Sequence, residues 1–146
     1  MINRRKLDRV LQSIEARRGQ FILAALFQRE DLPTLWDLVV SAPWLRDGDR
    51  KALGWIARPV TKSLAARELH GLARIVTLNP DEPVLKKILT DLGTITEPVE
   101  KVGHNLFGLP VEHAYVFRSM RRASTKPGQR SAVRTRRRET VQSGRP

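Results

Sequence analysis

The stretch from residue 73 to residue 92, ARIVTLNPDEPVLKKILTDL, constrains the fold most because its hydrophobic period changes partway along. It starts with the run IVTL, which is short and rich in β-branched residues and therefore predicts a strand. Residues 79–83 contain two prolines and two acidic residues, which are typical of a turn and of a helix start. A helix should follow, because the next apolar residues have the i, i+3, i+4, i+7 spacing of an amphipathic helix and Gly93 is suited to end it. These apolar residues are Leu85, Ile88, Leu89 and Leu92.

The turn in this unit raises the question of phosphate binding, because helix amino termini at the ends of strands attract anions. Asp81 and Glu82 stand at that position here. Their carboxylates would satisfy the helix dipole and repel a phosphate. We therefore predict structural capping by these residues, with phosphate binding as the less favoured alternative.

The residues before this stretch have helical patterns. Residues 4–17 form a strong amphipathic pattern, with Leu7, Val10, Leu11 and Ile14 on one face. Residues 20–30 are apolar all round, which predicts a buried helix, with a buried strand as the alternative. Residues 33–42 begin with an early proline and capping-box-like spacing, which predicts another helix. A further helix should begin near Arg50, and Pro59 should kink it or split it in two.

The residues after the central unit predict strands. Residues 94–96 can return as a strand and complete a β-α-β element, and residues 99–107 and 111–120 have the pattern of a hairpin. Apolar residues on both faces of residues 113–117 predict an interior strand. The architecture we predict is α+β, with an N-terminal bundle of four or five helices packed on a small mixed sheet, which consists of the βαβ unit and the C-terminal hairpin. We expect residues 1–120 to form a single domain.

Length and composition limit the class of protein. A chain of 146 residues has the size of one domain and can bury a substantial core. The absence of cysteine and of a secretory apolar segment at the amino terminus favours a reducing compartment, so we expect a cytoplasmic protein. The longest apolar run, residues 21–27, is far shorter than the roughly 20 residues of a membrane-spanning helix. We expect no membrane association.

The net charge of +12 is concentrated at the two ends of the chain. Residues 1–18 carry +4, residues 19–117 carry −1 and residues 118–146 carry +9. A nearly neutral body with basic ends is consistent with attraction to a polyanion. Two other origins of the charge are open, namely genome composition, since arginine outnumbers lysine, and solubility. Residues 121–146 lack the apolar residues needed to form a core, so we expect a disordered, Arg-rich tail.

These charges lead to a hypothesis of nucleic-acid binding. We expect a nucleic-acid-associated accessory protein that binds the phosphates of DNA or RNA non-specifically, through its basic tail and its first helix. The predicted contact residues are Arg4, Arg5, Lys6 and Arg9 in the helix and Arg121, Arg122, Lys126, Arg130, Arg134, Arg136, Arg137 and Arg138 in the tail. Sequence-specific reading by a helix-turn-helix at residues 33–42 and 50–58, with Arg50, Lys51 and Arg58 outward, is less favoured because the connection is too long.

The other functional hypotheses have less support. A protein-interaction module, acting as a subunit or neutralising partner of another protein, would need no catalytic residues and is the main alternative. An enzyme is not favoured, because the chain has no phosphate-binding glycine loop, nucleophile elbow or dinucleotide fingerprint. His70, His104 and His113 lack metal-binding spacing, so we expect neither a metal nor a cofactor. Trp36, Trp44 and Trp55 can form a platform for bases, but large aromatic residues in this context more often fill the core.

Overall fold

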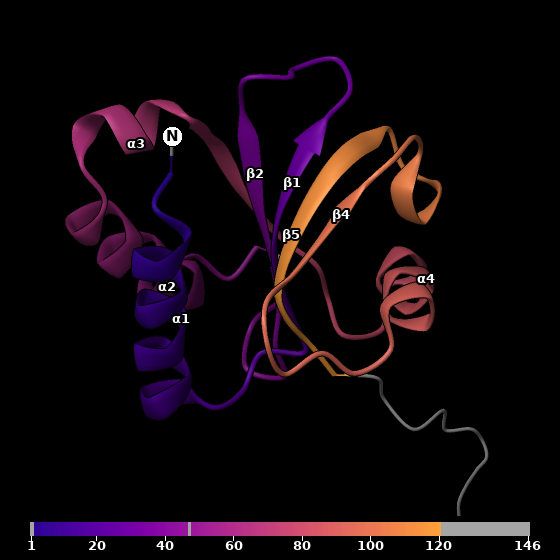
Figure 1. Cartoon of the computed structure of the whole chain (residues 1–146). Coiled ribbons are helices and arrows are strands. Elements are labelled where there is room, and N and C mark those ends of the chain that lie inside the picture. Colours follow the sequence, from indigo (N-terminus) through magenta and orange to yellow (C-terminus); the bar gives the residue numbers. More distant parts are fainter. Residues whose placement is uncertain (1, 47, 121–146) are drawn as a thin grey trace, which may run out of the picture.

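The computed structural model describes residues 2–46 and 48–120, which form a five-stranded mixed sheet with helices on both faces. In chain order the elements are α1 (Arg4–Arg18), β1 (Leu23–Arg29), β2 (Trp36–Ser41), α2 (Arg50–Ser63), α3 (Ala66–His70), β3 (Leu72–Thr77), α4 (Pro83–Leu92), β4 (Val99–Val102), the 3-10 helix η1 (Leu106–Gly108) and β5 (Val111–Ser119). Helices α1, α2 and α3 cover one face of the sheet, and α4 covers the other (Figure 1). The predicted α+β class and mixed sheet are thus confirmed. The four described helices roughly fit the predicted number of four or five, but they lie on both faces of the sheet instead of in one N-terminal bundle.

The order of the strands in the sheet is β3-β2-β1-β5-β4. Strands β2 and β3 are parallel and are connected through α2 and α3, whereas the other neighbouring pairs are antiparallel. Strand β5 lies between β1 and β4, so the predicted hairpin and interior strand are confirmed. Residues 94–96 contribute one antiparallel bridge, between Ile95 and Ser119, instead of a strand.

Two of the predicted helices are strands. Residues 20–30 contain β1, and residues 33–42 contain β2, so the helix assignments were wrong there. Every residue from 21 to 27 is buried, because β1 is the central strand and has a helical layer on each side. A short, fully apolar run has no period that distinguishes a buried strand from a buried helix. The capping signal before β2 was misleading because the carboxylate of Asp37 pairs with Arg29 and Arg74 instead of capping a helix.

The remaining helices match the prediction more closely. All four predicted apolar residues of α1 are buried, and the Asn3 side chain caps the helix by accepting the Lys6 N–H. Helix α2 runs through Pro59 as one element, so the proline does not split it. Helix α4 starts with proline, ends before Gly93 and buries Leu85, Ile88 and Leu89. Glu82 has the N-cap position, but its carboxylate accepts the N–H of Asn79 in the preceding turn.

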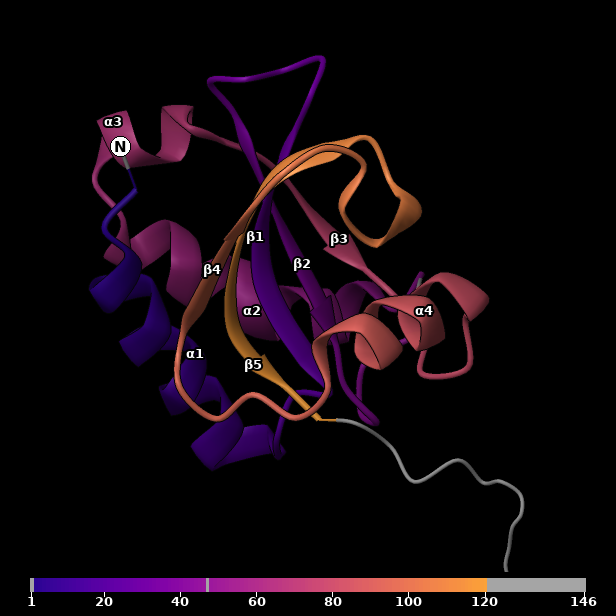
Figure 2. The ribbon, with the colours of Figure 1, turned by 45° about the vertical axis from the view of Figure 1, so that its right-hand side comes forward.

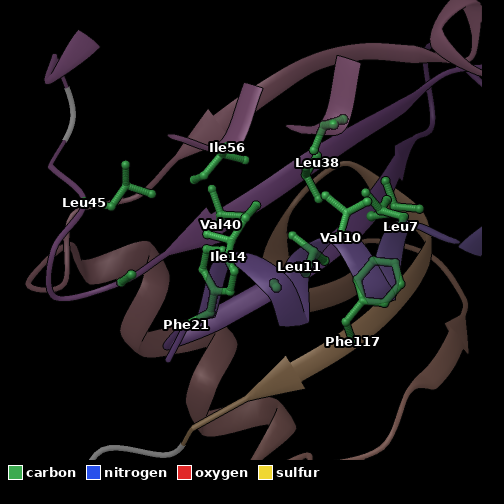
Figure 3. Close-up of a cluster of buried hydrophobic side chains, with 14 of the residues drawn as sticks. Leu7, Val10, Leu11, Ile14, Phe21, Leu38, Val40, Leu45, Ile56 and Phe117 are labelled. Atoms are coloured by element: carbon green, nitrogen blue, oxygen red, sulfur yellow. The ribbon is translucent and has the colours of Figure 1, made fainter. Parts of the chain in front are cut away.

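Apolar side chains form one core on each face of the sheet. Alternate strand residues face each layer, so that in β2 Leu38 and Val40 point toward α1 and α2 while Val39 points toward α4. Figure 3 shows the core beneath α1 and α2, with Leu11 and Phe117 among its fully buried members. Of the tryptophans, Trp36 is buried and the other two pack partly buried against the same cluster, which confirms their predicted core role. None of the described helices has the length and apolarity to span a membrane.

Candidate nucleic-acid interface

The four cationic residues predicted in the first helix have two different environments. Arg5 and Arg9 are exposed and one helical turn apart on the outer side of α1. Arg4 and Lys6 instead contact other parts of the protein. The structure therefore leaves Arg5 and Arg9 accessible to a ligand and gives the other two structural contacts.

Arg4 attaches the start of α1 to the sheet. Its guanidinium lies over the Tyr115 ring, at 4.6 Å from the centroid, and over the Trp36 ring at 5.6 Å. It also lies 3.8 Å from a carboxylate oxygen of Glu100 on β4. A guanidinium on aromatic faces and beside a carboxylate has favourable contacts already, so the predicted phosphate-binding role has no support at Arg4.

Lys6 is the cationic partner of a buried carboxylate, that of Glu68 on α3. Its ammonium donates to Glu68 Oε1 at 2.6 Å, and the backbone N–H groups of Asn3 and Ala65 donate to the same carboxylate at 2.7 and 2.8 Å. The hydrogen bond from Lys6, followed by those from the two backbone groups, lowers the pKa of the Glu68 carboxyl to about 2. Glu68 is therefore ionised at neutral pH, and its charge is matched by Lys6 beneath the surface.

The two acidic residues of α1 are neutralised by Arg118 of β5. The guanidinium of Arg118 lies 3.1 Å from Asp8 and 3.0 Å from Glu15, measured between side-chain nitrogen and carboxylate oxygen. The three side chains are 17%, 19% and 13% exposed for Arg118, Asp8 and Glu15, so the group lies between α1 and the sheet. Neither carboxylate is on the outer side of α1.

As a result, the outer surface of α1, α2 and α3 carries charges of one sign. All residues of these three helices are described, and among them every exposed charged side chain, leaving histidine aside, is cationic: four from α1, four from α2 and one from α3. They are Arg5, Arg9, Arg17, Arg18, Arg50, Lys51, Arg58, Lys62 and Arg67. We call these residues the cationic helix face.

Aromatic side chains underlie one part of this face. The Arg18 guanidinium lies 3.7 Å from the centroid of the Trp55 ring, and the Trp55 and Trp44 centroids are 6.1 Å apart. The indole N–H of Trp44 donates to the carbonyl of Gly19 at 3.1 Å. Trp55 is therefore covered by the Arg18 guanidinium, and Trp44 is hydrogen-bonded to the residue that follows Arg18.

The described part of the chain ends at Met120, directly after β5. The N–H of Met120 donates to the carbonyl of Ile22 at 2.8 Å, only four residues after α1 ends at Arg18. The end of β5 and the end of α1 lie at the same end of the molecule (Figure 1). The predicted contact residues from Arg121 to Arg138 lie outside the described residues.

The cationic residues of α2 and α3 were not among the predicted contacts. Arg50, Lys51 and Arg58 were placed outward only within a helix-turn-helix, and that motif is wrong because residues 33–42 contain strand β2. The sequence signal for α2 was its content of four basic residues and no acidic residue. The sequence could not show that the acidic residues of α1 and α3 have partners that remove them from the surface.

The histidines have separate surroundings. His113 pairs with Glu100 on the neighbouring strand, and Nδ1 of His104 lies 3.9 Å from Glu30. Within residues 2–46 and 48–120, no group of three or more His, Asp or Glu side chains is placed to hold a metal ion.

No model of a protein family matches the chain, and neither the curated proteins nor the solved structures gave a significant match.

Proposed function

We propose that the protein binds nucleic acid non-specifically, using the cationic helix face together with its basic carboxyl-terminal segment. The observation that carries the proposal is the single sign of the exposed charges on α1, α2 and α3. A surface of this kind attracts phosphates and releases their counterions on binding. Contacts with phosphates position a protein without reading bases, so this mode needs no sequence specificity.

The charge of the carboxyl-terminal segment supports a joint role. Residues 121–146 contain nine basic residues and one acidic residue. They follow Met120, whose N–H donates to the carbonyl of Ile22. A segment with this charge adds further guanidinium groups that can contact phosphates. The proposal includes a cytoplasmic location, which the absence of cysteine supports.

The experiment compares the salt dependence of binding for three variants. Labelled random-sequence duplex DNA is titrated by fluorescence anisotropy at several salt concentrations, and log Kobs is plotted against log salt. The first variant, Arg5→Gln with Arg9→Gln, should lower the magnitude of the slope by up to about 1.8, because each phosphate contact contributes about 0.9. The second, with Arg134, Arg136, Arg137 and Arg138 changed to Gln, should lower it by up to about 3.6.

The matched control is Lys86→Gln with Lys87→Gln. These lysines are also exposed on a helix and the control removes the same net charge, but they belong to α4 on the opposite face of the sheet. The slope should stay unchanged. An equal decrease in the control and the α1 variant would contradict a defined interface. Absence of binding by the wild type at low salt would reject the proposal and favour the protein-partner alternative.

A further inference from the structure

A crevice opens where β2 and β3 end. These strands are parallel and pair Val40 with Thr77, so they end at the same edge of the sheet. The connection after β2 leads to α2 on one face, whereas the connection after β3 leads to α4 on the other (Figure 2). In open α/β sheets, ligands bind in the crevice formed where connections from neighbouring strand ends run to opposite faces.

The crevice contains a cavity of about 440 Å³. This volume lies within the range of roughly 300–1,000 Å³ that is typical of small-molecule sites. Its charged lining consists of Arg46, Arg50 and Arg74 together with Asp49, and its apolar wall consists of Leu53 and Ile75. We call this cavity with its lining the β2–β3 crevice. Three guanidinium groups beside an apolar wall suit a ligand that has a phosphate at one end and a less polar body.

One of the three arginines is held in place from inside the sheet. The Arg74 guanidinium lies 3.4 Å from the carboxylate of Asp37, whose side chain is only 6% exposed. Arg29 pairs with the same carboxylate at 3.6 Å and also with the exposed Asp31. Side-chain positioning by a buried partner reduces the entropy that a binding residue loses when it contacts a ligand.

Another arginine has a partner that an anionic ligand can replace. The Arg46 guanidinium lies 3.8 Å from a carboxylate oxygen of Asp81, so this ion pair joins the connection after β2 to the connection after β3. The two side chains are 60% and 80% exposed. Exposed ion pairs of this length are weak, so a phosphate dianion can compete for Arg46. The carboxylate of Asp49 does not pair with Arg46 in this way, because it accepts the N–H of Ala52 as the N-cap of α2.

We propose that the β2–β3 crevice binds a mononucleotide unit, with its phosphate on Arg46, Arg50 and Arg74 and its base and sugar along the apolar wall. The unit can be a free mononucleotide or the phosphorylated 5′ end of a strand, because both present the same phosphate monoester. Since Asp49 already caps α2, the guanidinium groups bind the anion and the helix amino terminus does not. This inference rests on the cavity, and of its three arginines only Arg50 also belongs to the cationic helix face.

The test is calorimetric titration of the full chain with adenosine 5′-monophosphate at low salt, with adenosine and inorganic phosphate as reference ligands. The mononucleotide should bind more tightly than either reference ligand, because only it meets both the arginines and the apolar wall. Arg50→Ala should reduce its affinity about tenfold or more, the usual effect of losing a charge-assisted contact. Asp81→Asn should increase the affinity, because it releases Arg46 and removes a repulsive charge. The absence of heat from the mononucleotide, or an unchanged affinity in Arg50→Ala, would overturn the proposal.

Two further comparisons keep the result interpretable. Arg74→Ala should also weaken binding, but it leaves Asp37 with one cationic partner fewer and can disturb folding, so Arg50→Ala decides. Arg5→Gln with Arg9→Gln should retain mononucleotide affinity while it loses DNA affinity, which separates failure of this inference from failure of the proposed function. Displacement of labelled strands by the mononucleotide identifies the natural source of the phosphate, when strands with a 5′ phosphate are compared with strands that have a 5′ hydroxyl.

If the protein binds strands with a 5′ phosphate more tightly, the crevice binds strand ends. If the mononucleotide displaces both kinds of strand equally, the crevice binds the free mononucleotide.

Discussion

The two layers that cover the sheet have similar interiors and different surfaces. Beneath α1, the side chains of Leu7 and Leu11 are fully buried, and beneath α4 those of Leu85 and Ile88 are equally buried. On the outside, α1, α2 and α3 expose nine cationic side chains and no carboxylate, whereas α4 exposes two lysines and Asp91. Burial of apolar surface explains why both layers pack on the sheet, but it does not explain this difference in charge.

The charges on the layer of α1, α2 and α3 therefore have an origin other than packing. Charges of one sign on a surface repel one another and oppose the compact state. In α1 and α3 the acidic residues that would offset this repulsion are paired inward, with Arg118 and with Lys6. A layer shaped only for stability would gain from exposed carboxylates at i, i+4 from its arginines. The proposed nucleic-acid binding rests on this property of the cationic helix face.

The largest expected effect tests the similarity of the two interiors. Leu11→Ala under α1 and Leu89→Ala under α4 should each destabilise the protein by about 2–5 kcal/mol, because each removes a buried side chain and leaves a cavity. Urea unfolding followed by circular dichroism measures both. Lys86→Ala, at an exposed position of α4, provides the control and should change little. A large loss for Leu11→Ala alone would show that α4 is not part of the cooperative core.

An intermediate effect concerns the inward pairing of Glu68. Because the pKa of its carboxyl falls from 4.5 to about 2 on folding, Glu68 adds stability above pH 4.5, and this contribution is lost as the pH falls toward 2. Glu68→Gln should therefore be less stable than the wild type at neutral pH, and the two should converge in acid. Unfolding midpoints in urea at pH 7, 4.5, 3 and 2 would measure this. A constant difference over that range would contradict the role assigned to the Lys6 hydrogen bond.

The sequence predicted best those elements that are buried on one side. Helices α1 and α4 have clear periods, and in α4 Leu85, Ile88 and Leu89 are buried where the spacing predicted. Strands β1 and β2 are buried on both sides, so their apolar runs carry no alternation and were assigned to helices. For residues 20–30 the alternative interpretation, a buried strand, was the correct one, but the apolar run has no period that could have favoured it.

The candidate interface was predicted only in part, because pairing in space decides which charges are exposed. Arg5 and Arg9 are exposed, but Arg4 and Lys6, which have the same type of charge in the same helix, contact Tyr115 and Glu68. Tyr115 is more than 60 residues away from Arg4 in the chain, and Glu68 is also more than 60 residues away from Lys6. Local patterns cannot show such contacts. The crevice could not be predicted for the same reason, because Arg46 and Arg74 line one cavity although they are far apart in the chain.

The smallest expected effect is on stability when exposed charges are removed from either layer. Arg5→Gln with Arg9→Gln, and Lys86→Gln with Lys87→Gln, should each change the free energy of unfolding by no more than about 0.5 kcal/mol, because exposed side chains contribute little and Gln keeps helix propensity. Because charges within the cationic helix face repel one another, Arg5→Gln with Arg9→Gln should stabilise the protein slightly at low salt, and added salt should remove this stabilisation. Urea unfolding at two salt concentrations measures both variants. If the first pair instead lost more than about 1 kcal/mol, Arg5 and Arg9 would be serving the fold, and their exposure would no longer argue for an anionic partner.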